Sequence, residues 1–138
     1  MKYGVICAME EEIKSLHSAL TVTNETDING ITFYEGTIQN TEVVLVRSGI
    51  GKVEAGITAA LLVTNFKVDA LIHSGSAGGI GKELSVGDVV VSTQTLYHDV
   101  DATAFGYKLG QLPGQPARFD ADPKLVAEIV DAGHKTGL

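Results

Sequence analysis

The sequence predicts an α/β fold with a central β-sheet that helices cover on both faces. Apolar runs of strand length alternate with helical patterns along the chain, which is the order typical of α/β proteins. The run at 69–72 is apolar after its first residue without alternation, as expected for a strand buried on both faces. With 138 residues and 44% hydrophobic content the chain can bury one core, so we expect residues 1–138 to form one domain or part of one.

The first two elements are a strand at 2–8 and a helix at 10–20. The strand is an apolar run, and acidic residues follow it directly. Negative charge in the first turn of a helix complements the helix dipole, so these acids suit a helix that begins there. An apolar stripe of this helix is expected to face inward at Ile13, Leu16 and Leu20.

The middle of the chain predicts further strands and a second helix. The strands are expected at 31–38, 41–47, 68–74 and 87–93, and the helix at 52–66. Only Gln39-Asn40 separates the first two of these strands, which predicts a tight hairpin turn.

A long connection and a third helix follow. Residues 94–121 are rich in Gly, Pro, Asp and aromatic residues, and they are too many for a simple connector. The third helix is expected at 123–135, with Asp122 as its cap and Pro123 at its first helical position. Its apolar residues are expected to point inward: Val126, Ile129 and Val130.

Composition excludes several classes of function. A net charge of −7 and the lack of a Lys or Arg cluster argue against a nucleic-acid partner. The single cysteine, Cys7, lies in an apolar run, which predicts a buried, reduced thiol. The N-terminus lacks a signal-peptide pattern, and no apolar stretch approaches the roughly 18 residues of a membrane span. We therefore expect a soluble, cytoplasmic protein without membrane contact.

Three consecutive carboxylates, Glu10, Glu11 and Glu12, are the first candidates for acid–base chemistry. All three could simply be first-turn residues of the helix, where their charge stabilises the dipole. Glu12 differs because it lies beside the inward stripe rather than opposite it. The residues alone leave both interpretations open for Glu12.

Two glycine clusters also follow strands. Ser-Gly-Ile-Gly-Lys at 48–52 leaves one strand, and Ser-Gly-Ser-Ala-Gly-Gly at 74–79 leaves another. Ligands of open α/β sheets bind outside the carboxyl ends of strands, so these turns and the acidic turn outline a small-molecule pocket. Neither cluster matches a nucleoside-triphosphate loop or the Gly-x-Gly-x-x-Gly pattern. The alternative is that the glycines only permit tight strand exits.

Other polar and aromatic residues fall in the segment 94–121. His-Asp-Val-Asp at 98–101 could offer ligands to a metal ion, but no second set at ligand spacing supports it. We therefore expect no metal and no cofactor. Phe105, Tyr107 and Pro113 suit a loop that covers a ligand or a partner surface, or a loop packed on its own core.

Five motifs occur in order along the chain. They are Ala-Met-Glu-Glu-Glu at 8–12, Ser-Gly-Ile-Gly-Lys at 48–52, Gly-Ser-Ala-Gly-Gly at 75–79, Val-Gly-Asp-Val-Val at 86–90 and Tyr-His-Asp-x-Asp-x-Thr-Ala-Phe-Gly-Tyr at 97–107. Together they resemble the bacterial 5′-methylthioadenosine/S-adenosylhomocysteine nucleosidases of the purine nucleoside phosphorylase superfamily. The resemblance implies a three-layer sandwich with a mixed central sheet. It also implies hydrolysis of the N-glycosidic bond of both nucleosides, with release of adenine and a thioribose product.

The resemblance further implies roles for individual residues. Glu12 would activate the water that attacks the ribose anomeric carbon, in a reaction that builds positive charge on the sugar. Substrate would contact six residues of the acidic turn and the glycine turns: Ala8, Met9, Ile50, Ser76, Ala77 and Gly78. A neighbouring subunit of a homodimer would lend four residues to the pocket for the 5′-substituent: Ala102, Phe105, Tyr107 and Pro113.

The family pattern also includes a later Met-Glu pair that holds the ribose and a later Asp that helps to protonate adenine, and this chain ends at Leu138 before either. We therefore expect the N-terminal portion of such an enzyme, incomplete and inactive as it stands. Two alternatives remain open. One is a nucleoside phosphorylase of the same superfamily, although the acids at 10–12 would repel phosphate. The other is a non-catalytic binding or assembly fragment.

Overall fold

The computed structural model describes residues 1–138. It divides into two compact units, unit 1 at Met1–Gly78 and unit 2 at Gly79–Leu138, and each unit is described by itself. The expectation of a single domain concerns both units together and stays a prediction.

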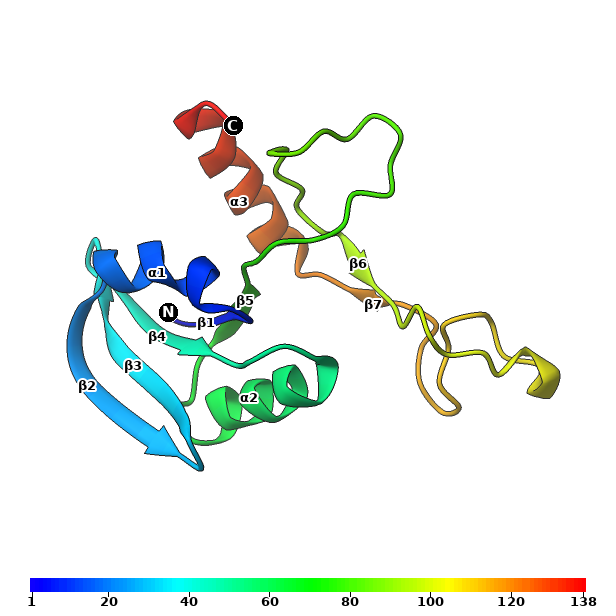
Figure 1. The fold of residues 1–138 in the computed structure, drawn as a ribbon, viewed down its shortest axis with the longest axis horizontal. Coiled ribbons are helices and arrows are strands. Elements are labelled where there is room, and N and C mark those ends of the chain that lie inside the picture. The colour runs from blue at the N-terminus through cyan, green and yellow to red at the C-terminus, as the bar shows by residue number, and fades with distance from the viewer. The chain divides into compact units, whose positions relative to one another are not determined.

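Unit 1 is built on a five-stranded mixed sheet with the strand order β2-β3-β4-β1-β5 (Figure 1). β1 is parallel to β4 and to β5, whereas β2, β3 and β4 form antiparallel pairs. In chain order the elements are β1 (Lys2–Cys7), α1 (Glu10–Ala19), β2 (Thr21–Ile28), β3 (Ile31–Ile38), β4 (Thr41–Arg47), α2 (Lys52–Thr64) and β5 (Ala70–His73).

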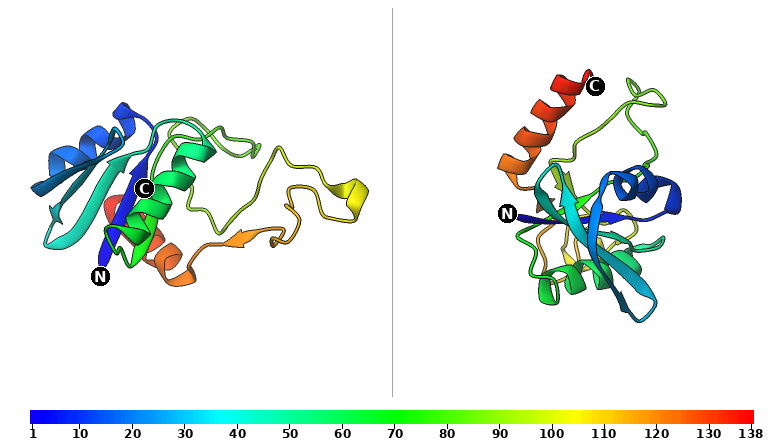
Figure 2. Two further views of the ribbon diagram at one scale, coloured as in Figure 1. Left: turned by 90° about the horizontal axis from the view of Figure 1, so that it is seen from below. Right: turned by 90° about the vertical axis from the view of Figure 1, so that its left-hand side faces the viewer.

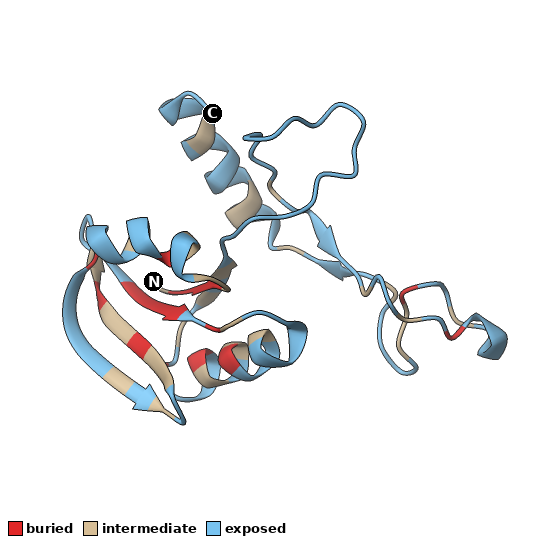
Figure 3. Ribbon diagram, viewed as in Figure 1, coloured by how far each residue is buried: buried red, intermediate tan, exposed pale blue.

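The two faces of this sheet carry separate apolar clusters, because successive side chains of a strand point to opposite faces. The cluster under α1 consists of Val5, Cys7, Ile13, Leu20, Val43 and Leu45, with Leu16 packed against it. The cluster under α2 consists of Ile6, Phe33, Val44, Val46, Leu62 and Phe66. The two helices lie on opposite faces of the sheet (Figure 2), and the buried residues concentrate on its central strands (Figure 3). The predicted three-layer α/β fold with a mixed sheet is confirmed.

Most elements of unit 1 lie where the sequence places them. β3 and β4 have the predicted bounds, and the predicted turn between them has both residues at positive φ, Gln39 at 48° and Asn40 at 67°. The helices predicted at 10–20 and 52–66 are α1 and α2. β5 is shorter than the predicted strand at 68–74.

The sequence prediction missed β2. This strand is mostly polar and exposed, because it lies at the edge of the sheet and pairs only with β3. It therefore lacks the apolar pattern by which strands are predicted. The turn that follows it does carry a signal: Asn29 and Gly30 have φ of 53° and 82°, and Asn-Gly favours a two-residue hairpin turn.

Unit 2 contains β6 (Gln94–Thr95), the 3₁₀ turn η1 (Thr103–Phe105), β7 (Phe119–Asp120) and α3 (Pro123–Thr136). β6 and β7 form a short antiparallel pair. The prediction of a strand at 87–93 is wrong, since no regular element forms there and both Val89 and Val90 are exposed. An apolar run becomes a strand only where another strand pairs with it, and none does so here.

The predicted start of α3 is confirmed, whereas the predicted burial of its apolar residues is not. The Asp122 side chain accepts hydrogen bonds from the backbone N–H groups of Lys124 and Leu125 at 2.9 and 3.0 Å, and Pro123 is the first helical residue. The predicted inward face is wrong, because α3 has no buried residue: Val126 is half-buried, and Ile129 and Val130 are 38% and 39% exposed. The spacing of apolar residues identifies the helix but cannot supply a surface for it to pack on. No helix of the structure combines the length and apolarity needed to cross a membrane.

Candidate active site

Glu12 lies in the first turn of α1, directly after the end of β1. Its Oε2 accepts hydrogen bonds from the backbone N–H groups of Ala8 at 2.9 Å and Met9 at 3.0 Å. An acidic residue at the third helical position commonly accepts such a bond from the residue that caps the helix. The contact with Met9 alone is therefore what an ordinary helix start would show.

The other carboxylate oxygen of Glu12 binds a residue from a different strand. Oε1 accepts hydrogen bonds from the backbone N–H and from the hydroxyl of Ser76, both at 2.8 Å. Ser76 follows β5, which is the parallel neighbour of β1, so the carboxyl ends of the two strands lie side by side. Helix capping does not account for this second pair of bonds.

The four hydrogen bonds lower the pKa of Glu12 from its ordinary value of 4.5 to about 2. The backbone N–H of Ser76 contributes most, followed by the Ser76 hydroxyl, and the N–H groups of Met9 and Ala8 add to the effect. Partial removal from water acts in the opposite direction, since it raises the pKa. Glu12 is consequently a carboxylate throughout the physiological pH range.

The lowered pKa of Glu12 predicts a specific loss of stability in acid. Because the folded-state pKa of about 2 is below the ordinary value of 4.5, the hydrogen bonds to the charged carboxylate stabilise the fold above pH 4.5. Their contribution is lost as the pH falls from 4.5 toward 2. We expect the difference in unfolding midpoint between the original chain and Glu12→Gln to shrink over that range, as followed by urea unfolding at a series of pH values. Glu11→Gln, which removes a neighbouring exposed carboxylate from the same helical turn, is the matched control, and equal behaviour of the two variants would contradict the prediction.

The remaining candidate residues of unit 1 lie on the two glycine turns without direct bonds to Glu12. On the first turn Ser48 is buried and its backbone N–H donates to the carbonyl oxygen of Cys7 at 2.9 Å, which ties this turn to the end of β1. Ile50, two residues further, is 78% exposed. Ala77 and Gly78 are exposed on the second turn, and Ala8 and Met9 are half-buried. The structure thus brings Ala8, Met9 and Ser76 onto Glu12 and leaves Ile50, Ala77 and Gly78 facing solvent.

The candidate residues of unit 2 lie on and around η1. Ala102 is buried, and its carbonyl oxygen accepts hydrogen bonds from the backbone N–H groups of Phe105 and Tyr107. Phe105 is 83% exposed, Tyr107 is half-buried and Pro113 is exposed. The aromatic side chain of Phe105 therefore has no core of its own in this unit.

The acidic residues beside this turn serve local structure. Asp101 Oδ1 accepts hydrogen bonds from the backbone N–H and hydroxyl of Thr103 at 3.0 and 2.6 Å, and these bonds hold the pKa of Asp101 below its usual range. His98 Nδ1 lies 4.0 Å from an oxygen of Asp99. No group of three or more His, Cys, Asp or Glu side chains in the structure could hold a metal ion.

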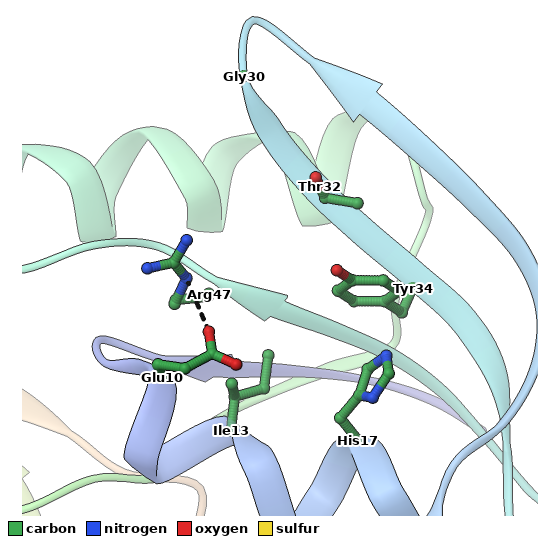
Figure 4. A pocket seen from close by; sticks show the side chains of 7 residues that line it. All are labelled: Glu10, Ile13, His17, Gly30, Thr32, Tyr34 and Arg47. Carbon is green, nitrogen blue, oxygen red and sulfur yellow. Dashed lines mark ion pairs between the residues drawn. The ribbon is translucent and has the colours of Figure 1, made fainter.

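A separate surface pocket of about 140 Å³ lies on the face of the sheet that α1 covers (Figure 4). Glu10 and Arg47 form an ion pair at its edge, with Nε and Oε2 3.5 Å apart. The rings of His17 and Tyr34 meet edge to face, with centroids 4.6 Å apart. Glu12 does not line this pocket. Sequence reasoning did not find it, since its residues come from separate elements without a shared motif.

The fold agrees with the comparisons with known proteins. The chain belongs to the phosphorylase superfamily, whose family model matches residues 2–138. It is similar to curated 5′-methylthioadenosine/S-adenosylhomocysteine nucleosidases. That of Exiguobacterium sp. is 53% identical over 131 residues, which are 95% of this chain and 56% of the relative. The predicted resemblance to these nucleosidases is confirmed, and the chain spans a little over half the length of the curated relatives it matches.

Solved structures show the same similarity. The nucleosidase from Neisseria meningitidis in complex with methylthio-immucillin-A has a TM-score of 0.95 at 43% identity, covering 99% of this chain and 59% of that one. The nucleosidase from Colwellia psychrerythraea in complex with adenine has a TM-score of 0.96 at 46% identity, covering 99% and 57%. Futalosine hydrolase of Helicobacter pylori has a TM-score of 0.92 at 30% identity, covering 100% and 60%.

Proposed function

We propose that this chain carries the carboxylate part of a nucleosidase site that hydrolyses the N-glycosidic bond of 5′-methylthioadenosine and S-adenosylhomocysteine. The observation that supports this most directly is the hydrogen bonding of Glu12. Hydrogen-bond donors at the ends of β1 and β5 bind its carboxylate and keep it charged. The nucleosidases named above, with bound adenine or a methylthio-immucillin, support the substrate class.

Glu12 has two tasks in the proposed reaction. As the bond between ribose and adenine breaks, positive charge develops on the sugar, and a fixed carboxylate stabilises it. Water then forms a bond to the anomeric carbon, the electron pair of the broken bond leaves with adenine, and a proton of the water passes to Glu12.

The hydrogen bonds to Glu12 restrict where this water can bind. A carboxylate offers about four lone-pair positions, and four donors fill them here. Three donors belong to the backbone, whereas the Ser76 hydroxyl can rotate about its own side chain. We therefore place the attacking water at the position that this hydroxyl occupies on Oε1. The resemblance implies that Ser76 contacts the substrate, and its contact with Glu12 adds this second role.

Substrate contacts belong to the same proposal. Met9 and Ile50 would line the ribose and alkylthio region, and Ser76, Ala77 and Gly78 the base and ribose. The exposed Phe105, with Tyr107 and Pro113, would enter the 5′-substituent pocket of a neighbouring subunit, with the buried Ala102 beside them, and this arrangement requires a homodimer. Sedimentation should then show two chains, and a fully active monomer would contradict this arrangement.

We also place the protein in the cytoplasm, where the reduced thiol of Cys7 is stable.

Product analysis tests the reaction type. A completed form is made by joining this chain to the part of the Exiguobacterium relative that it does not match. We expect this form to release adenine and free thioribose from methylthioadenosine, at a rate unchanged by added phosphate or by a chelator, because the site turn is acidic and no ligand cluster is present. A ribose 1-phosphate product would indicate a phosphorylase, and loss of activity on chelation would indicate a metal enzyme.

A further inference from the structure

Gly75 lies between the end of β5 and Ser76, beside the carboxylate of Glu12. A Cβ placed on Gly75 would be 2.9 Å from Oε1, 3.0 Å from Cδ and 3.0 Å from Oε2 of Glu12. Non-bonded carbon atoms do not come this close to other heavy atoms, so either the new Cβ or the Glu12 carboxylate would have to move. The carboxylate of Glu12 therefore occupies the space that any other residue at this position would fill.

The backbone of Gly75 does not itself require glycine. Its φ is outside the left-handed region, unlike Gly49 and Gly51 of the other glycine turn, with φ of 85° and 117°. The φ of Gly75 therefore gives no reason for glycine at this position. The usual reason for glycine in a tight strand exit thus does not apply to Gly75.

From these contacts we infer that Gly75 is a positioning residue for Glu12. Because glycine has no side chain, the carboxylate of Glu12 can lie beside position 75, where Ser76 binds it. A Cβ at position 75 would act first on the site, because the three atoms nearest to it all belong to the movable end of the Glu12 side chain. The atom nearest to this Cβ is Oε1, which accepts both bonds from Ser76, so a displaced carboxylate would lose these two bonds. The consequence for catalysis rests on the function proposed above, whereas the effect on Glu12 does not.

The direct test follows the Glu12 carboxyl group by NMR in the 138-residue chain across an acid titration. We expect Gly75→Ala to move the pKa of Glu12 from about 2 toward the ordinary value of 4.5, and to abolish the response of the Ser76 amide to this titration. Gly79→Ala is the matched control, because a Cβ there meets only Leu84 at ordinary contact distances of 3.5 and 3.6 Å. A Glu12 pKa that stays near 2 in Gly75→Ala would overturn the inference.

A double variant separates this inference from a general folding defect. In a Glu12→Ala chain the space beside position 75 is empty, so the further change Gly75→Ala should leave the unfolding midpoint the same or raise it. If Gly75→Ala alone unfolds and the double variant folds, the clash with Glu12 is the cause and the inference holds. If both unfold, position 75 needs glycine for another reason and the inference fails.

The completed form provides a functional measurement. Activity requires charged Glu12, so a raised pKa should shift the acid limb of the kcat/KM profile to higher pH in Gly75→Ala and leave it unchanged in Gly79→Ala. An active enzyme with the same acid limb in both variants would overturn the positioning role. If the unaltered completed form cleaves no nucleoside, the proposed function fails, and the NMR titration still decides the role of Gly75.

Discussion

Glu12→Gln is expected to lower the rate of adenine release by the completed form by about 100-fold or more, the usual scale for a positioned acid–base group. The amide is isosteric with the carboxylate but carries no charge and takes up no proton. It also presents an N–H group where Ser76, Ala8 or Met9 donates, so one pair of the four hydrogen bonds is lost. The fold should persist, because the strands and both apolar clusters of unit 1 do not depend on this side chain.

The measurement is adenine release from methylthioadenosine, with circular dichroism to confirm the fold. Glu11→Gln is the control, since it makes the same chemical change one residue away at an exposed position. Near-normal turnover by Glu12→Gln would remove Glu12 from the mechanism.

The 138-residue chain alone is expected to release adenine at least about 100-fold more slowly than the completed form. Small-molecule sites normally bury most of their ligand, and exclusion of water strengthens the electrostatic effect of a carboxylate. In this chain Ile50 is 78% exposed, and Ser76, Ala77 and Gly78 face solvent. The groups bonded to Glu12 are backbone N–H groups and one hydroxyl, so none of them is an acid able to protonate the departing adenine.

This comparison uses both proteins at equal concentration, with intact masses verified. Turnover by the chain alone within tenfold of the completed form would contradict the prediction. It would show that the release of adenine needs no acid beyond those that this chain contains.

The sequence predicts best those elements whose buried residues give a regular spacing of apolar residues along the chain. β1, β3 and β4 pack on both faces of the sheet, and α1 buries Ile13, with Leu20 buried at the cap of its C-terminal end. β2 leaves no such pattern because its neighbour is present on one side only. The run at 87–93 has the composition of a strand, yet pairing between strands is a long-range property that composition does not contain.

The candidate site, too, is predicted from the sequence only in part. Glu12 could be proposed from its position after a strand and beside an apolar stripe. Its bonds to Ser76, 64 positions away in the sequence, depend on the parallel pairing of β1 with β5. The sequence places Gly75 in a glycine turn that follows a strand, but it does not reveal that a distant carboxylate fills the space beside this residue.

Because Cys7 is buried, the reactivity of the only thiol in the chain measures local opening of the structure. Its side chain has no exposed surface, and burial, together with the nearby charge of Glu12, raises the pKa of the thiol. A labelling reagent can react with Cys7 only while the apolar cluster under α1 is open, either because α1 moves away from the sheet or because β1 separates from β4 and β5. The labelling rate of the native protein therefore reports how often this cluster opens, without any engineered probe. A nucleoside that bound at the ends of these strands would slow the reaction.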